Sequence, residues 1–414
     1  MRLLYSLAWI AILPFALLHL LRRARKQPAY LKHWGERLGL APKLDGRPVL
    51  WLHAVSVGET RAAAPLVRAM QARHPDHAIL LSHATPTGRA TGRELFGAAV
   101  IQCYLPYDFP PLVWLFLQRT QPQLGVVMET EIWPNLYAAC ARRGIPLFLV
   151  NARLSEQSAR GYRRFRALTA PALRSLAGIA AQTEADARRL VELGANGVQI
   201  AGNVKFDVTP AAATEARAQA LREQFSGRFV FLAASTREGE EAMLLEALAG
   251  LDIPDLLIVL VPRHPQRFDA VAAWLERQQS PFVRRSAGQP VPPDTRVFLG
   301  DSMGELAAYY AAADLAYVGG SLLPLGGQNL IEAAAAGCPA LIGPHTWNFS
   351  EATEQAVACG AALRVADVGE LARQLESLYR QPDVRRQMHA AGLRFAAANR
   401  GATERVMAML ERYC

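Results

Sequence analysis

The sequence is poor in cysteine, and none of its five cysteines belongs to a CxxC pair; they are Cys103, Cys140, Cys338, Cys359 and Cys414. An odd, scattered set argues against a disulfide framework and against a zinc site, and it indicates reduced thiols in the cytosol. The chain also lacks a GxGxxG fingerprint after a strand, a P-loop, an HExxH pair and a GxSxG elbow. A nicotinamide enzyme is therefore only weakly supported, and the signatures of a P-loop nucleotidase, a zinc protease and an α/β-hydrolase are absent.

Acidic residues are scarce near the N-terminus. Between Arg22 and Arg47 the chain has eight Lys or Arg but only two acids, Glu36 and Asp45, and the whole chain carries a net charge of +9. This balance predicts anionic partners. The basic stretch is either a solvated flank or a surface for anionic lipid headgroups, and the two interpretations are compatible.

An apolar run occupies residues 3–21, LLYSLAWIAILPFALLHLL, and RRARK follows it at once. Nineteen helical residues, at about 1.5 Å each, nearly cover a hydrocarbon core of about 30 Å. Positive charge directly after the run predicts that the body of the protein stays on the cytoplasmic side. The charges follow the run and no cleavage site is clear, so we expect an uncleaved anchor. Pro14 and His19 leave open a segment that dips into the bilayer without crossing it.

From Val49 onward, short apolar runs alternate with helical patterns such as the one over 60–73. A first series of strands is expected at 49–53, 78–83, 100–106, 124–129, 146–151, 178–183 and 198–202. A second series is expected at 229–235, 256–262, 296–300, 315–321, 339–344 and 361–366. Continuous apolar strands between helices predict parallel sheets covered by helices.

The polar, Ala-rich stretch near residues 208–228 separates the two series. We therefore predict an α/β chain of three parts: an anchor with its basic flank at 1–26, and two Rossmann-like domains at 27–208 and 209–414. Two such domains predict a cleft between them, with ligands at the carboxyl ends of the strands.

Glu59 follows the first strand, in the loop AVSVGE before a helix. An acid at a helix start is stabilised by the helix dipole, by about 0.3–1 kcal/mol, which would be a purely structural role. Gly58 beside it permits close backbone approach. In that setting Glu59 could face the cleft as a general base toward a substrate hydroxyl.

Three further charged residues are expected at the same edge. METEIWPN places Glu129 and Glu131 directly after an apolar strand, and GNVKFD places Lys205 after the last strand of the first series. The acids could instead form an ion pair with Arg153, and Lys205 could instead pair with Asp207. Otherwise Lys205 could neutralise a developing negative charge.

The second half contains a candidate nucleotide site. Arg263 ends a strand, Gly304 and Glu305 lie in a strand-to-helix turn, and GGSLLPLGGQNLIEAAAAGCP covers 319–339. Two GG pairs before a helix that is expected to open at Asn329 form a natural phosphate cradle. Glu332 could accept hydrogen bonds from a ribose.

At this point the motifs resemble those of one family, the bacterial 3-deoxy-D-manno-octulosonic acid (Kdo) transferases of lipopolysaccharide biosynthesis. The resemblance spans residues 32–349 and is carried by KHWGERLG, HAVSVGET, ATPTG, YLPYD, METEIWPN, NARLS, GNVKFD, STREGEE, LVPRHPQR, GDSMGEL, YVGGS, GGQNLIEAAAAG and GPHTWNF. Many separate motifs in the right order are far more specific than any one of them.

The resemblance implies a GT-B-like fold and an inverting, metal-independent transferase without cofactors. By this resemblance, the domain at 27–208 of this chain would hold the acceptor, a lipid A precursor (lipid IVA), and the domain at 209–414 would hold the CMP-Kdo donor. Glu59 matches the family's general base, and Glu129 and Lys205 match residues that stabilise the transition state. The positions that would bind CMP are Pro262, Arg263, Met303, Gly304, Glu305, Asn329, Leu330, Ile331 and Glu332.

One residue departs from the family pattern: Gln328 stands where relatives often have His, which puts an acid–base role at that position in doubt.

The expected location is the bacterial inner membrane, with the catalytic domains in the cytoplasm, anionic lipids as neighbours and no nucleic-acid partner. Two alternatives stay open, another GT-B enzyme that uses a UDP-sugar (a transferase or an epimerase) and a non-catalytic lipid-binding scaffold. Competition between CMP and UDP for the donor site would distinguish a Kdo transferase from an enzyme that uses a UDP-sugar.

Overall fold

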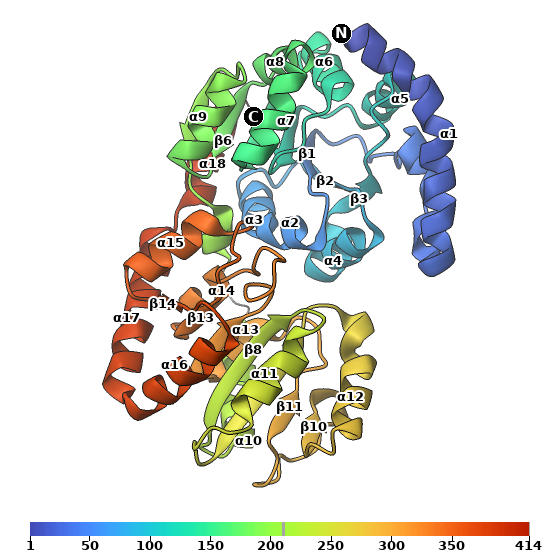
Figure 1. Cartoon of the computed structure of the whole chain (residues 1–414). Coiled ribbons are helices and arrows are strands. Elements are labelled where there is room, and N and C mark those ends of the chain that lie inside the picture. The colour runs from blue at the N-terminus through green and yellow to red at the C-terminus, as the bar shows by residue number, and fades with distance from the viewer. Residues whose placement is uncertain (209–211, 414) are drawn as a thin grey trace. The chain divides into compact units, whose positions relative to one another are not determined.

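The computed structural model describes residues 1–208 and 212–413, which form two compact units. Unit 1 comprises residues 1–208 together with the C-terminal segment from Asn399, and unit 2 ends at Ala398. Thr209, where the second domain was expected to begin, and Cys414 lie outside the described residues. Each unit is an α/β layer structure (Figure 1).

Unit 1 is built on a seven-stranded sheet in the order β3-β2-β1-β4-β5-β6-β7, and every neighbouring pair is parallel. The strand order reverses between β1 and β4, so the loops after these two strands leave the sheet at a topological switch point. The strands are β1 (Val49–His53), β2 (Ala78–His83), β3 (Ile101–Tyr104), β4 (Leu124–Met128), β5 (Leu147–Ala152), β6 (Gly178–Ala181) and β7 (Val198–Ile200).

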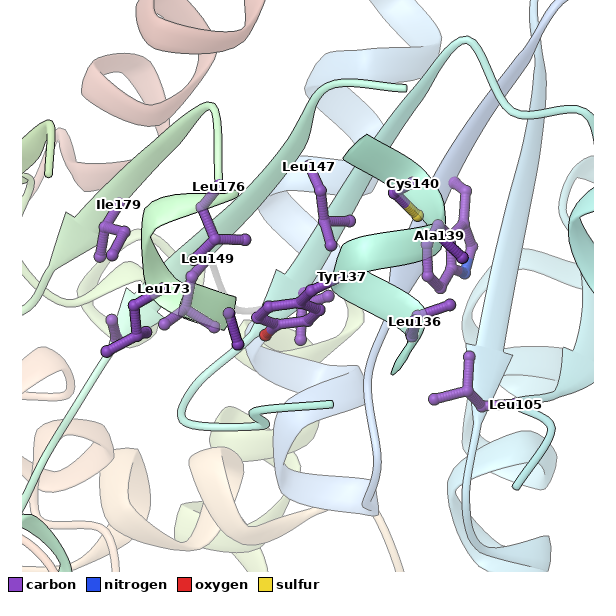
Figure 2. Close-up of a cluster of buried hydrophobic side chains, with 14 of the residues drawn as sticks. Leu105, Leu136, Tyr137, Ala139, Cys140, Leu147, Leu149, Leu173, Leu176 and Ile179 are labelled. Atoms are coloured by element: carbon purple, nitrogen blue, oxygen red, sulfur yellow. The ribbon is translucent and has the colours of Figure 1, made fainter. Parts of the chain in front are cut away.

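Helices cover both faces of this sheet. Alternate residues of the strands point to opposite faces, and both sets are apolar, which explains the continuous apolar runs in the sequence. On one face, α5, α6, α8 and α9 pack on Leu149 and Ile179, and Figure 2 shows Tyr137 and Cys140 of α6 in this cluster. The helices of the unit are α1 (Arg2–Lys26), α2 (Val57–Ala62), α3 (Ala64–Arg73), α4 (Pro86–Phe96), α5 (Pro110–Thr120), α6 (Pro134–Arg142), α7 (Glu156–Arg164), α8 (Arg166–Arg174), α9 (Glu184–Glu192) and α18 (Ala402–Leu410). Short 3-10 helices are η1 (Pro28–Leu31), η2 (Trp34–Leu38), η3 (Gly97–Ala99), η4 (Val204–Asp207) and η7 (Glu411–Tyr413).

The expected helix over 60–73 is two helices, α2 and α3, which meet at Ala63. Pro65 lies in the first turn of α3. Because proline has no backbone N–H and clashes with the preceding turn, it belongs at a helix start and not inside a helix. The break leaves Glu59 on a short helix of its own, directly after β1.

The expectation that residues 209–414 form one domain is wrong at its C-terminal end, because α18 returns to unit 1. Val406, Met407 and Leu410 are buried against the face of the sheet that α3 also covers. The carboxylate of Asp207 accepts hydrogen bonds from the backbone N–H groups of Gly401 (2.7 Å) and Thr403 (2.6 Å). The apolar face of α18 therefore completes the core of the first unit.

Unit 2 has a second parallel seven-stranded sheet, in the order β10-β11-β9-β8-β12-β13-β14. Its strands are β8 (Phe229–Thr236), β9 (Leu256–Pro262), β10 (Phe282–Arg284), β11 (Val297–Leu299), β12 (Leu315–Val318), β13 (Ala340–Ile342) and β14 (Ala362–Arg364). Its helices are α10 (Ala212–Gln224), α11 (Glu240–Leu248), α12 (Phe268–Arg277), α13 (Leu306–Ala312), α14 (Ile331–Ala335), α15 (Ser350–Ala358), α16 (Val368–Arg380) and α17 (Pro382–Ala398), with 3-10 turns η5 (Pro265–Arg267) and η6 (Arg285–Ala287). The edge strand β10 was not expected, because three residues between polar stretches give no periodic signal.

The expected fold class is confirmed: each unit has a helix-covered parallel sheet, and thirteen of the fourteen strands in the described part of the chain overlap an expected run. The N-terminal helix α1 is long and apolar enough to cross a membrane, by length and composition.

Candidate active site

The loop after β1 holds Glu59 through a capping arrangement. Ser56 caps α2, and its side chain accepts a hydrogen bond from the backbone N–H of Glu59. In return, the Glu59 carboxylate accepts from the Val55 backbone N–H (2.8 Å) and from the Ser56 hydroxyl (3.0 Å). The structural role considered for Glu59, an acid at a helix start, is therefore real. It also fixes the carboxylate at the carboxyl end of β1.

The Glu59 carboxyl group is held close to the neutral pH range. Burial raises its pKa to about 7, the charge of Glu129 adds to the rise, and the hydrogen bonds from Val55 and Ser56 oppose it. Glu131 contributes a smaller rise of the same sign. The three carboxyl groups, from the loops after β1 and β4, therefore lie near one another. A carboxyl group with a pKa near 7 can accept a proton at neutral pH and later release it.

Glu129 forms the link between this acidic group and a cation. Its backbone has a φ of +57°, which a residue with a side chain seldom adopts, and its N–H donates to the Val150 carbonyl at 2.9 Å. Lys205 donates from Nζ to Oε1 of Glu129 at 2.9 Å, with both side chains less than a third exposed. The structure therefore brings together Glu59, Glu129 and Lys205, which the sequence placed on three separate loops.

Lys205 is positioned by two asparagines, neither of which was predicted from the sequence as part of the site. Asn203 caps η4, and its side chain accepts from the Lys205 backbone N–H at 3.0 Å. The fully buried Asn151, with a φ of +53°, accepts from the Val204 N–H at 3.1 Å through its side chain. Asp207 is not the partner of Lys205, because its carboxylate caps the segment before α18. The only sequence signal was the Asn residues themselves, which tolerate left-handed backbone and cap turns.

Glu131 is a further titratable group in the loop between β4 and α6. Burial raises the pKa of Glu131 to about 7, and the charge of Glu129 adds to the rise. The Tyr137 hydroxyl donates to the Glu131 carbonyl, and the Thr130 hydroxyl donates to the Arg153 carbonyl. These contacts tie the METE loop to α6 and to the loop after β5.

In unit 2, the loops after β9 and β12 meet through Arg263 and Gln328. The Arg263 backbone N–H donates to the Thr236 carbonyl at 2.9 Å, and its side-chain Nε donates to Oε1 of Gln328 at 3.0 Å. Pro262 ends β9 beside it. Gln328, the residue that departs from the family pattern, thus orients a guanidinium group without needing to titrate.

The glycine-rich loop over 319–330 is held by a buried carboxylate. Glu240, which is fully buried, accepts from the Gly320 backbone N–H with both oxygens at 2.8 Å and also from the Tyr317 hydroxyl. A Cβ at Gly319 would lie 2.4 Å from the Ser235 carbonyl oxygen, so only glycine permits this approach. Glu240 lies in the STREGEE motif, but its role could not be read from the sequence.

The helix expected to open at Asn329 begins at Ile331 as α14 and has only five residues. A helix this short has a small dipole, so any phosphate contact depends on individual N–H groups and not on a long helix. The Asn329 side chain accepts from the Ile331 N–H (3.1 Å) and donates to Glu332 (3.0 Å). Leu330 and Ile331 are buried, so their side chains belong to the core.

The turn after β11 places Met303 on the surface and Gly304 in left-handed backbone, with a φ of +79°. Glu305 forms a bidentate ion pair with Arg285, in which Nε and Nη2 of the arginine each donate to one carboxylate oxygen at 3.0 Å. The hydrogen bonds from Arg285 lower the pKa of Glu305. The Glu305 side chain is therefore held by Arg285, and its backbone carbonyl accepts from the N–H groups of Ala308 and Tyr309.

Within residues 1–208 and 212–413, no group of three or more His, Cys, Asp or Glu residues has the arrangement of a metal site. Of the cysteines in these ranges, all four are free thiols, and burial raises the pKa of Cys140 to about 12. None of them is placed as a nucleophile.

Comparisons with known proteins agree with these motifs. The family model described as 3-deoxy-D-manno-octulosonic-acid transferase (kdotransferase) matches residues 32–208. A 3-deoxy-D-manno-octulosonic acid transferase of Bordetella pertussis is 45% identical, covering 98% of each chain, and one of Haemophilus influenzae is 37% identical, covering 94% of this chain and 93% of that one. A solved UDP-GlcNAc 2-epimerase of Neisseria meningitidis is 15% identical, covers 88% of this chain and all of that one, and has a TM-score of 0.62, which shows a shared fold. The chain thus belongs to the Kdo transferase family of glycosyltransferases.

Proposed function

We propose that this enzyme transfers Kdo from CMP-Kdo to a hydroxyl group of the lipid A precursor lipid IVA, with Glu59 as the general base. The observation that carries the proposal is the Glu59 carboxylate, fixed at the end of β1 with a pKa of about 7. Membership in the family supports the sugar that is transferred and the CMP-linked donor.

The proposed reaction is a single displacement at the anomeric carbon. Glu59 takes the proton from the acceptor hydroxyl while the oxygen of that hydroxyl forms the new bond to the anomeric carbon. The bond from that carbon to the phosphate oxygen breaks at the same time, and CMP leaves with the electron pair. Attack from the face opposite the leaving group inverts the configuration.

Lys205 supplies positive charge beside the acidic group. Kdo itself carries a carboxylate, and negative charge grows on the departing phosphate. Lys205 is held by Glu129 at 2.9 Å, so its ammonium group is positioned before substrate binds. We propose that Glu129 and Lys205 act together in this way, with no divalent metal.

The donor site that we propose is formed by the loops at the carboxyl ends of the unit 2 strands. Arg263, oriented by Gln328, would face the phosphate of CMP, and the glycine-rich loop up to Glu332 would face the nucleotide with its backbone and with the polar groups of Asn329 and Glu332. The turn at Met303, Gly304 and Glu305 and the end of β9 at Pro262 complete it.

We propose that the acceptor reaches unit 1 from the cytoplasmic face of the inner membrane, where α1 anchors the protein. The basic stretch between Arg22 and Arg47 would attract the acceptor's phosphates and the anionic leaflet. Anchoring raises the local concentration of a substrate that is confined to the membrane.

The test is transfer from CMP-Kdo to purified lipid IVA, with chelator present and no added metal, by the wild type and by Glu59→Gln. Transfer by the wild type that is lost in the variant supports the donor, the acceptor, metal independence and the base. Wild-type activity that appears only with metal contradicts metal independence alone. No transfer by a folded wild type, together with turnover of a UDP-sugar, would replace the proposal with the rival sugar-nucleotide reaction.

A further inference from the structure

Helix α1 has two different faces along its length. The residues that are at least partly covered follow helical spacing; they include Ser6, Trp9, Leu20 and Ala24. Large apolar side chains project elsewhere, exposed by 45–73%, namely Leu3, Leu7, Ile10, Phe15 and Leu18. One stripe of the helix therefore packs on protein, and the remaining apolar surface has no partner within the described chain.

The first turns of α1 contact the folded body of unit 1, not only the residues that follow the helix. The Ser6 hydroxyl donates to Oδ1 of Asn135 on α6 at 3.0 Å, and the Trp9 ring lies 5.9 Å from the Tyr107 ring, between centroids. At its other end, the guanidinium of Arg23 lies 4.7 Å from the Tyr30 ring centroid. Figure 1 shows α1 beside α5, and residues of both helices line one cavity.

These contacts conflict with a helix that crosses the bilayer. A crossing α1 would carry Ser6 and Trp9 to the far leaflet, about 30 Å from a cytoplasmic body. Keeping the contacts with Asn135 and Tyr107 would instead draw α6, with its charged end, into hydrocarbon, which is costly. A helix that lies in the plane of the interface satisfies both the contacts and the exposed apolar face.

A cavity of about 320 Å³ lies where α1 meets α5 and α6. Three arginines line it, Arg2 from α1 and Arg142 and Arg143 from the end of α6, together with Leu3 and Trp114. Among the residues that the structure describes, none of these arginines forms an ion pair. Nη2 of Arg143 donates to the Trp114 carbonyl at 3.3 Å, whereas its buried Nη1 has no hydrogen-bond partner.

The chemistry of this cavity matches an anionic phospholipid. Arginine forks bind phosphate oxygens well, and three unpaired positive charges in one cavity call for an anion. The apolar Leu3 and the ring of Trp114, which is 57% exposed, lie beside the arginines, as at the boundary between headgroups and acyl chains. An exposed apolar rim next to guanidinium groups suits a lipid phosphate better than a soluble one.

We propose that α1 lies in the plane of the cytoplasmic leaflet without crossing it, and that the cavity lined by Arg2, Arg142 and Arg143 binds the phosphate of an anionic phospholipid. The proposal does not depend on the donor, acceptor or base proposed above, because it concerns only α1, α5 and α6. Its tests therefore use binding and topology, and a failed transfer assay would leave them unaffected.

The topology test is protease protection of the full-length protein in sealed vesicles, with an epitope before Met1. A helix in the plane leaves the epitope on the same side as the catalytic units, so protease added to that side removes both together. An epitope that stays protected until the vesicles are opened would overturn the in-plane arrangement.

The lipid test is flotation with phosphatidylcholine vesicles and with vesicles that contain about one-third phosphatidylglycerol, for the wild type and for Arg142→Gln/Arg143→Gln. Each removed charge should weaken binding to the anionic vesicles roughly fivefold, with little effect on phosphatidylcholine vesicles. The matched control is Arg164→Gln/Arg166→Gln, which removes the same charge from exposed positions that do not line the cavity. The single variant Arg142→Gln changes an exposed side chain and keeps the test valid if Arg143 proves necessary for folding.

Two outcomes would reject the phospholipid. Equal losses in the cavity variant and in the control would show general charge attraction and no site. Displacement of the protein from the anionic vesicles by millimolar inorganic phosphate, at matched ionic strength, would show a site for soluble phosphate. Thermal melting of each variant, compared with the wild type, verifies that the proteins are folded.

Discussion

Lys205 and Glu129 form an ion pair, Nζ to Oε1 at 2.9 Å, although 76 residues separate them in the chain. Each comes from a loop at the carboxyl edge of the unit 1 sheet, and Glu129 adopts left-handed backbone at this point. The pair lies beside Glu59, whose pKa rises partly because of the Glu129 charge. Lys205 thus partly neutralises Glu129, whose charge adds to the larger effect of burial in raising the pKa of Glu59.

Glu59→Gln should abolish transfer while leaving the protein folded. A glutamine cannot take the acceptor proton, and loss of a general base lowers the rate by roughly 10²–10⁴-fold. The fall should appear in kcat, with CMP binding unchanged by calorimetry. Val55→Ala, beside Glu59 in the same loop, is the control, because only its backbone bonds to the carboxylate. A Glu59→Gln enzyme with normal kcat would remove Glu59 from the mechanism.

The pH dependence of kcat/KM should follow the Glu59 carboxyl group. Because a base acts when it is unprotonated, the rate should rise with pH through a pKa of about 7 and then level off. Ser56→Ala removes a hydrogen bond that favours the charged form, so it should move the rising limb to higher pH. Glu129→Gln removes a neighbouring negative charge and should move it to lower pH. Opposite shifts to these would contradict the assignment.

The same pKa values predict how stability depends on pH. Glu59 and Glu131 have pKa values raised from 4.5 to about 7, so the folded state binds protons more tightly than the unfolded state. The stabilisation that these two carboxyl groups add to the free energy of unfolding is therefore complete below pH 4.5 and is lost as the pH rises through 7. Glu131→Gln should reduce the fall in melting temperature between pH 5.5 and 8. A variant with the same fall as the wild type would show that Glu131 does not titrate in this range.

Much of the fold could be predicted from the sequence, because the strands are buried on both faces and so appear as continuous apolar runs. The edge strand β10 and the return of α18 could not be predicted. A three-residue strand has no periodic signal, and the amphipathic pattern of α18 does not tell which unit it covers. The carboxyl-edge positions of Glu59, Glu129 and Lys205 followed from strand ends. Asn151, Asn203 and Glu240 were missed because their roles depend on backbone angles and on partners far away in the chain.

Glu240→Gln should disorder the glycine-rich loop and weaken donor binding. An amide has one accepting oxygen, and Oε2 of Glu240 also accepts from the Arg237 N–H at 2.8 Å. The bonds from Gly320, Tyr317 and Arg237 therefore cannot all be kept, at a cost of about 1–3 kcal/mol in the free energy of unfolding. The KM for the donor should rise more than kcat falls. Glu238→Gln, which removes the same charge from an exposed position two residues earlier, is the control. Equal effects in the two variants would mean that net charge, and not the loop, is responsible.

Met407→Ala should destabilise unit 1 from a position that lies almost at the end of the chain. Met407 is fully buried in the core on which α3 and α18 both pack. Truncating a buried methionine costs about 2–5 kcal/mol, because apolar contact is lost and a cavity remains. Chemical unfolding should therefore show an earlier transition for the unit that carries Glu59, although α18 follows unit 2 in the chain. Glu404→Gln, on the same helix as Met407, removes an exposed ion pair with Arg73 of α3 and should cost less than about 1 kcal/mol. If Met407→Ala were as mild as this control, α18 would be an accessory helix, and the core of unit 1 would be complete without it.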